Sequence, residues 1–422
     1  MFKKTTLKNG LRIVTVPDRK SKAVTVLVLI GTGSKYEKKE TNGISHLLEH
    51  LLFKGTKKKP TSTDVIEPLD SIGGAYNAFT SEECTGYFAK VGSEHFEMAL
   101  ETISDIYLNS KLDSKEIKKE KSVIIEEINM YQDHPASYVQ VLWNKVLYGD
   151  QPAGWDVAGT KEGVTKISRQ EIIDYINHQY TASNTVVCIA GNIEKEKDVI
   201  NKVKKYFSGI KTKDSFEKIK VVENQRQPEC LLYQKSTDQT HFCLGVRGYE
   251  ALHPKRYIQE VLSVLLGGMM SSRLFIKIRE EMGLAYYIRT NSSSDTDTGF
   301  LVSQTGVDNK KVEQAISAIL KEYKKVSQKL VSPKELKKAK ENLKGKMTLL
   351  LETSDAQASF YGLQEVLHNE THTPEEIYDK IEEVSSKDIL DTAKDIFKLE
   401  NLNLAIIGPF KDKEKFQKLL KI

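Results

Sequence analysis

The chain repeats parts of its own sequence at a distance of about half its length. Residues 112–119 recur, with conservative changes, as residues 331–338, and residues 167–174 recur as residues 384–391. The offsets are 219 and 217 residues in a chain of 422. Two segments that recur at nearly the same offset indicate a duplicated fold, because each copy forms the same kind of structural unit. We therefore expect two halves of similar structure.

The boundary between the halves is expected in a polar stretch. Residues 211–228 hold Lys, Glu, Asn and Gln with little apolar periodicity, as is typical of a linker. This divides the chain into an N-terminal domain at 1–210, a linker at 211–228 and a C-terminal domain at 229–422. A chain of this length is expected to form about two to three domains.

Both halves mix strands with helices. In the first half, residues 11–16 and 23–30 are apolar and β-branched, and Asn9-Gly10 precedes the first of these strands as a hairpin turn. Helical patterns follow at 94–109 and 114–131. This order predicts an α+β fold of two homologous domains, each with helices packed on one face of a mostly antiparallel sheet.

Residues 46–50 indicate the chemistry of the first half. His46 and His50 are four residues apart, and Glu49 directly precedes the second histidine. On a helix, residues four apart lie one above the other on one face, so both imidazoles can reach one metal ion. This is the inverted form of the zinc-protease signature. A catalytic zinc needs a third protein ligand and one open position for water.

The third ligand is expected from a glutamate-rich segment further along the chain. Glu120 and Glu127 are seven residues apart, which is two helical turns, so both carboxylates project from one face. We assign Glu127 as the ligand and Glu120 as a carboxylate that holds a histidine or the ligand helix in place. Glu126 is turned by about 100° from Glu127, and the choice between them rests on the relation to Glu120 alone.

Each pattern also has a purely structural interpretation. The segment 43–53 could be an ordinary buried helix with two hydrogen-bonded histidines, and the glutamates at 115–127 could form a solvated face. A metal site is favoured because the apolar stripe of the first helix is complete without the histidines. A glutamate between them would also be costly to bury without a charged partner. The expected N-cap is Asn42, and the stripe consists of Ile44, Leu47, Leu48 and Leu51.

The repeat indicates that only the first half binds metal. A shift of 219 residues carries Glu120 onto Ala339 and Glu127 onto Lys346. The expected counterpart of the histidine helix, at 258–266, contains no histidine. We expect the second half to close a chamber and to contact the substrate instead.

In these motifs the chain resembles the pitrilysin-type metallopeptidases, in the branch that contains the mitochondrial processing peptidase and its bacterial relatives. The resemblance covers nearly the whole chain. Beyond the histidine motif and Glu127, it is carried by residues 43–45, 53–56, 73–80 with Tyr87, and 279–286. Each motif is weak alone, but a chance match in this order and at these separations is improbable.

The ligand set predicts a zinc-dependent endopeptidase or oligopeptidase. One Zn²⁺ per chain, held by His46, His50 and Glu127, would lower the pKa of a zinc-bound water, the expected nucleophile, toward ~7. Glu49 would remove a proton from that water as general base and deliver it to the leaving amine. The site would keep a net positive charge, which helps to stabilise an oxyanion.

The resemblance assigns further residues to substrate binding. Residues 77–80 look like the family's edge strand, onto which a peptide adds by main-chain hydrogen bonds, although they also fit a plain strand that ends in a turn. Arg279 and Tyr286 resemble a pair that contacts the carbonyl groups of bound peptide and the oxyanion. They also fit a surface arginine and a core tyrosine. The residues of the edge strand are Asn77, Ala78, Phe79 and Thr80.

The resemblance also implies an assembly. In family members with four such modules, the zinc lies in the first module and the Arg and Tyr pair in the fourth. This chain has two modules and both sets of residues, so we expect a homodimer with composite sites facing an enclosed chamber. Such a chamber would limit substrates by size to short unfolded peptides or presequences. The alternative is a non-catalytic subunit, or a peptidase that works only with a different, zinc-free partner.

Charge, apolar runs and cysteine content limit the partners and the cellular location that the sequence supports. The net charge is only +5, and the lysine clusters at 57–59 and 118–121 have no interleaved aromatic residues, which does not support nucleic-acid binding. The longest apolar run, at 23–30, is too short to span a bilayer, and the first residues do not resemble a signal peptide. Four scattered cysteines favour a reducing compartment. We expect a bacterial-type cytoplasmic enzyme without membrane or nucleic-acid partners.

Overall fold

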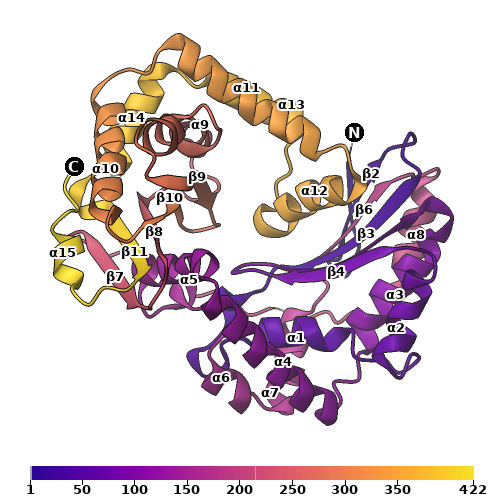
Figure 1. Ribbon diagram of the computed structural model, residues 1–422. Coiled ribbons are helices and arrows are strands. Elements are labelled where there is room, and N and C mark those ends of the chain that lie inside the picture. Colours follow the sequence, from indigo (N-terminus) through magenta and orange to yellow (C-terminus); the bar gives the residue numbers. More distant parts are fainter. Residues whose placement is uncertain (1, 214) are drawn as a thin grey trace. The chain divides into compact units, whose positions relative to one another are not determined.

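The computed structural model describes residues 2–213 and 215–422, which form two compact units. The first unit comprises residues 1–128, 156–219 and 348–373, and the second comprises residues 129–155, 220–347 and 374–422. The units are built from interleaved segments, whereas the sequence predicted contiguous domains. No helix or strand lies in the described part of the predicted linker. Figure 1 shows the elements of both units.

The first unit contains a six-stranded sheet with the order β1-β2-β6-β3-β5-β4. Neighbouring strands are antiparallel except β2 and β6, which are parallel. As predicted, Asn9-Gly10 lies in the turn between β1 and β2, where Gly10 has a φ of +90°. The strands are β1 (Lys3–Thr6), β2 (Arg12–Pro17), β3 (Ala23–Ile30), β4 (Ala75–Thr80), β5 (Thr85–Gly92) and β6 (Thr185–Gly191).

Side chains alternate along each strand, so this sheet has two apolar faces. On one face, Val26 and Val28 of β3 belong to a core that includes residues of α1, α3 and α8. On the other face, Leu27 and Leu29 pack with Ala358 of α12. The helices with most of their residues in this unit are α1 (Ile44–Leu52), α2 (Ser62–Asp70), α3 (Phe96–Asn109), α4 (Ser114–Asp133), α6 (Lys161–Lys166), α7 (Arg169–Gln179), α8 (Glu196–Tyr206) and α12 (Ser354–His368).

The second unit contains a five-stranded sheet with the order β7-β11-β8-β10-β9, in which only β7 and β11 are parallel. Cys243 and Ala405 pack with Val139 and Leu142 of α5. The strands are β7 (Glu229–Gln234), β8 (Gln239–Arg247), β9 (Ala285–Ser294), β10 (Gly299–Asp308) and β11 (Leu402–Gly408). The helices are α5 (Pro135–Tyr148), α9 (Arg256–Gly267), the π-helix η5 (Phe275–Glu281), α10 (Val312–Gln328), α11 (Pro333–Leu350), α13 (Pro374–Glu383), α14 (Ser386–Ile396) and α15 (Lys413–Gln417).

Each sheet is covered by one helix from the other half of the sequence. α5 follows α4 in the first half and packs on the second sheet, whereas α12 follows α11 in the second half and packs on the first sheet. The predicted α+β class with two mostly antiparallel sheets is confirmed. The expectation of helices on one face is corrected, because α12 covers the second face of the first sheet. Periodicity shows that a helix buries one face, but not against which sheet.

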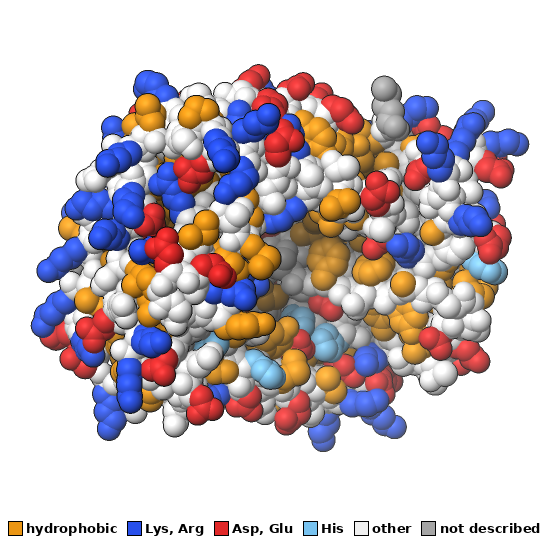
Figure 2. All heavy atoms as spheres, turned by 45° about the horizontal axis from the view of Figure 1, so that its top comes forward, with side chains coloured by type: hydrophobic (Ala, Val, Ile, Leu, Met, Phe, Trp, Pro, Cys, Tyr) orange, Lys and Arg blue, Asp and Glu red, His pale blue; other side chains and the backbone are white. Residues whose placement is uncertain are grey.

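The surface carries charges of both signs. On the face shown in Figure 2, Lys and Arg side chains lie among Asp and Glu side chains. Among the described residues, no helix is both long and apolar enough to cross a membrane.

A buried carboxylate starts the helix that carries the two histidines. Glu37 is 1% exposed. Its Oε2 accepts hydrogen bonds from the backbone N–H of Gly43 at 2.8 Å and the side-chain amide of Asn42 at 2.9 Å, and its Oε1 accepts from the N–H of Ser45 at 2.9 Å. The two backbone groups lack partners within α1, and the negative charge lies at the positive end of the helix dipole. Burial raises the pKa of Glu37, and these donors oppose the shift.

The expected N-cap, Asn42, is therefore replaced by a more distant residue. Gly43 occupies the N-cap position with a φ of +96° and has no side chain to cap with, while the side chain of Asn42 donates to Glu37. A Cβ at Gly43 would lie 2.8 Å from the carbonyl oxygen of Ala158. Glycine is thus required here by both the left-handed backbone and the close approach.

We expect Glu37→Gln to lower the free energy of unfolding by roughly 2–3 kcal/mol, because an amide NH₂ would face N–H donors and leave a buried one unpaired. Ser168→Ala, which removes the exposed cap of α7, should cost only about 1 kcal/mol. Denaturant unfolding of both variants checks this. An equal loss in the two would contradict the role of Glu37.

Gly362 of α12 lies against the first sheet, where an added Cβ would be 2.7 Å from Cδ1 of Leu29 and 3.3 Å from Cβ of Cys188. We expect Gly362→Val to destabilise the protein by about 1–3 kcal/mol through overpacking. Gly345 of α11 has no such neighbour within 4 Å, so Gly345→Val should stabilise by roughly 0.3 kcal/mol through helix propensity. Unfolding midpoints measure both, and a Gly362 variant at least as stable as wild type would contradict this packing.

Candidate metal centre

The two histidines and the distant glutamate converge in the first unit. His46 and His50 lie on α1 with their ring centroids 4.8 Å apart. Oε2 of Glu127 on α4 lies 3.6 Å from Nε2 of each histidine. These three residues are the one group in the described chain whose His, Cys, Asp or Glu side chains could hold a metal, with ligand atoms within 4.8 Å of one another. Glu126 is exposed and lies outside this group.

The separations fit a divalent ion. A hydrogen bond between N and O would need about 2.7–3.2 Å. Two ligand atoms of a tetrahedral zinc lie roughly 3.3–3.5 Å apart, given bonds of about 2.0–2.2 Å. Two imidazoles and one carboxylate also form the protein ligand set of one class of catalytic zinc sites. The residues present therefore fit Zn²⁺.

Glu120 lies where it can orient His50. It is 1% exposed, and its Oε2 lies 3.2 Å from Nδ1 of His50. An Nδ1–H that donates to this carboxylate leaves the lone pair on Nε2, which is the atom that faces Glu127. Nζ of Lys54 lies 2.9 Å from Oε1 of Glu120 and supplies the counter-charge that a buried carboxylate needs. Nδ1 of His46 is buried and has no hydrogen-bond partner among the described residues.

The protonation of the site follows from burial and the neighbouring carboxylates. Burial lowers the pKa of His46 to about 4, and the charge of Glu127 opposes this. Burial also lowers the pKa of His50, but the carboxylates of Glu127 and Glu120 raise it overall. The same contact with His50 lowers the pKa of Glu127. Because metal ligands must be deprotonated, an ion bound here would displace the proton from His50.

Glu49 lies beside the histidines and has a different partner. Oγ1 of Thr80 donates a hydrogen bond to Oε2 of Glu49 at 2.6 Å. Burial raises the pKa of Glu49, and the bond from Thr80 opposes this shift. A carboxylate with a raised pKa accepts a proton more readily near neutral pH.

The predicted substrate residues lie on edge strands, except Arg279. Residues 77–80 belong to β4, whose one side pairs with β5 and whose other side has no partner strand in the described residues. Arg279 lies on η5, and Tyr286 lies on β9, an edge strand of the second sheet. The guanidinium carbon of Arg279 is 5.1 Å from the ring centroid of Tyr286. Tyr286 is 79% exposed, so it is not a core tyrosine.

Two contacts of the site were missed from the sequence. Lys54 follows His50 by four residues, and this spacing was a signal that both could face Glu120. The sequence predicts a main-chain role for Thr80 in substrate binding and gives no role to its hydroxyl, which donates to Glu49. Nothing in the sequence links Thr80 to Glu49, because the two lie on different elements.

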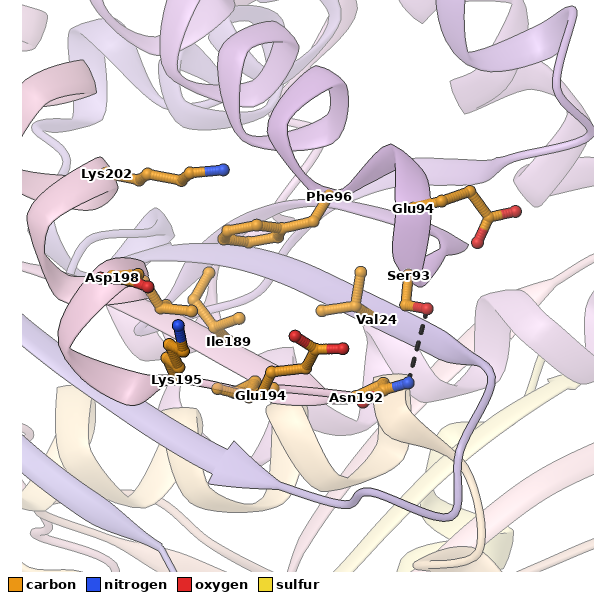
Figure 3. A pocket seen from close by; sticks show the side chains of 12 residues that line it. Val24, Ser93, Glu94, Phe96, Ile189, Asn192, Glu194, Lys195, Asp198 and Lys202 are labelled. Atoms are coloured by element: carbon orange, nitrogen blue, oxygen red, sulfur yellow. Dashed lines mark hydrogen bonds between the residues drawn. The ribbon is translucent and has the colours of Figure 1, made fainter.

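A separate depression of about 460 Å³ lies in the first unit and is lined by residues of β3, β6, α3 and α8. Figure 3 shows the apolar side chains of Val24 and Phe96 among charged ones, and Asn192 donates to Oγ of Ser93 at 3.5 Å. No residue of the candidate metal centre lines it. This depression and the candidate metal centre are therefore separate places in the first unit.

Comparison with protein families matches both halves of the chain. Residues 12–161 match the sequence model described as insulinase (peptidase family M16), and residues 166–343 match the one described as the peptidase M16 inactive domain. The first match contains His46, His50 and Glu127, and the second begins after all three.

Curated relatives match over nearly the full length. A Bacillus subtilis protein named "uncharacterized zinc protease YmxG" is 37% identical over 409 residues, which are 97% of this chain and 98% of the relative. A Rickettsia felis protein, also named as an uncharacterized zinc protease, is 32% identical over 406 residues, which are 96% of either chain.

Solved structures show the same fold. A protease from Helicobacter pylori has a TM-score of 0.90 at 24% identity and covers 97% of this chain and 99% of its own. A peptidase M16 inactive domain from Pseudomonas fluorescens has a TM-score of 0.89 at 14% identity, with coverages of 98% and 99%. The resemblance noted in the sequence is thus confirmed, and the chain belongs to peptidase family M16, the insulinase family.

Proposed function

We propose that this protein is a zinc-dependent endopeptidase that hydrolyses short unfolded peptides. The observation that carries the proposal is the convergence of Nε2 of His46, Nε2 of His50 and Oε2 of Glu127 next to the carboxylate of Glu49. The names of the relatives as zinc proteases support the same metal and reaction. One ion per chain is proposed because the described residues offer one such group.

The chain's own residues would divide the chemistry between them. A zinc ion, when bound, supplies a Lewis acid and lowers the pKa of water. Glu49 would take the proton from the attacking water and pass it to the leaving amine. Its Oε1 suits this task, because no hydrogen bond from the described part of the chain occupies it. Glu120 would hold His50 in the tautomer that presents Nε2.

Substrate binding is proposed at the free side of β4. Main-chain groups of an edge strand can pair with an extended peptide, which gives affinity with little demand on sequence. This requirement excludes folded substrates and fits peptides or presequences. The residues involved would be Asn77, Ala78, Phe79 and Thr80.

Arg279 and Tyr286 are proposed to donate hydrogen bonds to the peptide carbonyl and the oxyanion. A guanidinium and an exposed phenol hydroxyl are suitable donors. We propose that they act on the metal centre of a second copy in a homodimer, whose composite sites face an enclosed chamber. The presence of both the candidate metal ligands and the Arg279 and Tyr286 pair in one chain supports this assembly. That the protein is located in the cytoplasm and has no membrane or nucleic-acid partners stays a prediction.

The second candidate is a non-catalytic subunit, or one that depends on a different partner. The complete set of His46, His50, Glu127 and Glu49 favours a catalytic chain, because a subunit without catalysis would not need it. Size-exclusion chromatography of the purified chain, followed by a fluorogenic peptide assay with and without chelator, distinguishes these candidates.

We expect chelation to abolish peptide cleavage, and Zn²⁺ to restore it. Glu49→Gln should reduce turnover by about 10²–10⁴-fold with zinc content unchanged, because the base is not a ligand. Glu127→Gln should instead lower zinc content, whereas Glu126→Gln serves as the matched control and should keep both zinc and activity. Elemental analysis and kinetics measure both quantities. An empty site in Glu49→Gln would overturn its assignment.

Composite sites predict that two inactive variants complement each other. A mixture of His50→Ala and Arg279→Ala chains should recover about a quarter of wild-type activity, since half of the dimers are mixed and each mixed dimer holds one intact site. Each variant alone should be inactive. A mixture as inactive as its parents, despite proven subunit exchange, would rule out sites shared between copies.

A further inference from the structure

Thr80 links two parts of the proposed site: it contacts the general base Glu49, and it belongs to the edge strand β4. It is the last residue of β4. Side chains alternate along a strand, and Tyr76 and Ala78 of β4 pack against the core that includes α1. Thr80 shares their parity and points to the same face, where its Oγ1 lies 2.6 Å from Oε2 of Glu49.

The turn after Thr80 is held by its own hydrogen bonds. The N–H and Oγ of Ser81 both donate to the carbonyl of Cys84 at 2.9 Å, and the N–H of Cys84 donates to Oγ of Ser81 at 3.1 Å. The N–H of Lys35 donates to the carbonyl of Glu82 at 2.9 Å and ties the turn to the preceding segment. These bonds hold the turn directly after Thr80, and the pairing of Thr80 with Thr85 of β5 holds its own backbone.

A fixed hydrogen-bond donor such as the hydroxyl of Thr80 can hold the carboxylate of Glu49 in one orientation. A glutamate has three rotatable side-chain bonds, and at the partly buried position of Glu49 a directional hydrogen bond is needed to hold the carboxylate in one orientation. The bond from Thr80 occupies Oε2 and leaves Oε1 without a donor in the described part of the chain. Displacement of a catalytic group by about 1 Å can cost about 10²-fold in rate, so the orientation of Glu49 matters for turnover.

We propose that Thr80 is the positioning residue of the general base, because its hydroxyl orients Glu49 while its backbone belongs to the strand that receives the peptide. This inference rests on the proposed peptidase function. It adds a side-chain role to the backbone role proposed for Thr80, because the hydroxyl contacts Glu49 while the backbone stays available to substrate. One residue then sets the register between the peptide and the base.

Thr80→Val tests the inference, because valine keeps the β-branched shape and removes the hydroxyl. We expect kcat to fall by roughly 10- to 100-fold with KM and zinc content little changed. Thr80→Ser should recover most of kcat. Thr85→Val is the matched control, since it removes a hydroxyl of the facing strand that donates to the Thr32 carbonyl at 2.9 Å and does not reach Glu49. Its kcat should stay near wild type.

A double variant separates an effect through Glu49 from a direct effect on the peptide. Adding Thr80→Val to Glu49→Gln should cause no further loss of residual activity. Independently of turnover, the Kd of a fluorescent peptide for the slowly cleaving Glu49→Gln protein should be the same with and without Thr80→Val. A Kd that rises with Thr80→Val would show that the hydroxyl binds substrate and would overturn the inference.

The remaining outcomes are also decisive. If wild type cleaves peptide in a zinc-dependent manner and Thr80→Val matches its kcat, or if serine fails to restore kcat, the positioning role is wrong and the proposed function stands. If wild type loads zinc and cleaves no peptide, the proposed function and the role of Thr80 fall together.

Discussion

The rotation of α1 about its own axis is the constraint on which the candidate metal centre depends. Leu47, Leu48 and Leu51 are fully buried, and the hydrophobic effect holds this face against the sheet with about 1.5–3 kcal/mol for each leucine. The same rotation directs His46 and His50 away from the core and toward α4. α1 is nine residues long and carries both the apolar face and the histidines. A change that rotates the apolar face against the sheet therefore also rotates the histidines.

The exchange of helices makes the first unit depend on both halves of the sequence. Leu27 and Leu29 of the central strand β3 face α12, which lies more than 300 residues further along the chain. A fragment of residues 1–210 would expose this apolar face to water. The exchange is also anchored electrostatically, because the buried carboxylate of Glu365 on α12 lies 2.7 Å from Nζ of Lys4 and 3.3 Å from Nη1 of Arg12. The two predicted domains therefore share repeated segments, while each sheet packs against a helix from the other half of the sequence.

Periodicity explains what could be predicted and what could not. The positions of His46, His50, Glu120 and Glu127 follow from helical spacing, because residues four or seven apart share a face whatever surrounds them. The strands and their central place follow from apolar, β-branched runs. The pairing of α12 with the first sheet, and the cap that Glu37 provides for α1, depend on contacts between elements. No local pattern encodes which distant partner a buried group will meet.

Three buried or half-buried carboxylates of the first unit differ in their donors, and this difference separates their roles. Glu37 receives three N–H donors, two of them backbone groups, which saturate it and make it structural. Glu120 lies between a lysine cation and an imidazole, so it has a counter-charge beside it and can orient the ring. Glu49 receives a hydrogen bond from one neutral hydroxyl, which fixes its direction and leaves its other oxygen without a donor in the residues that the structure describes. A group that must exchange protons has to be held without being saturated, and only Glu49 among the three meets both conditions.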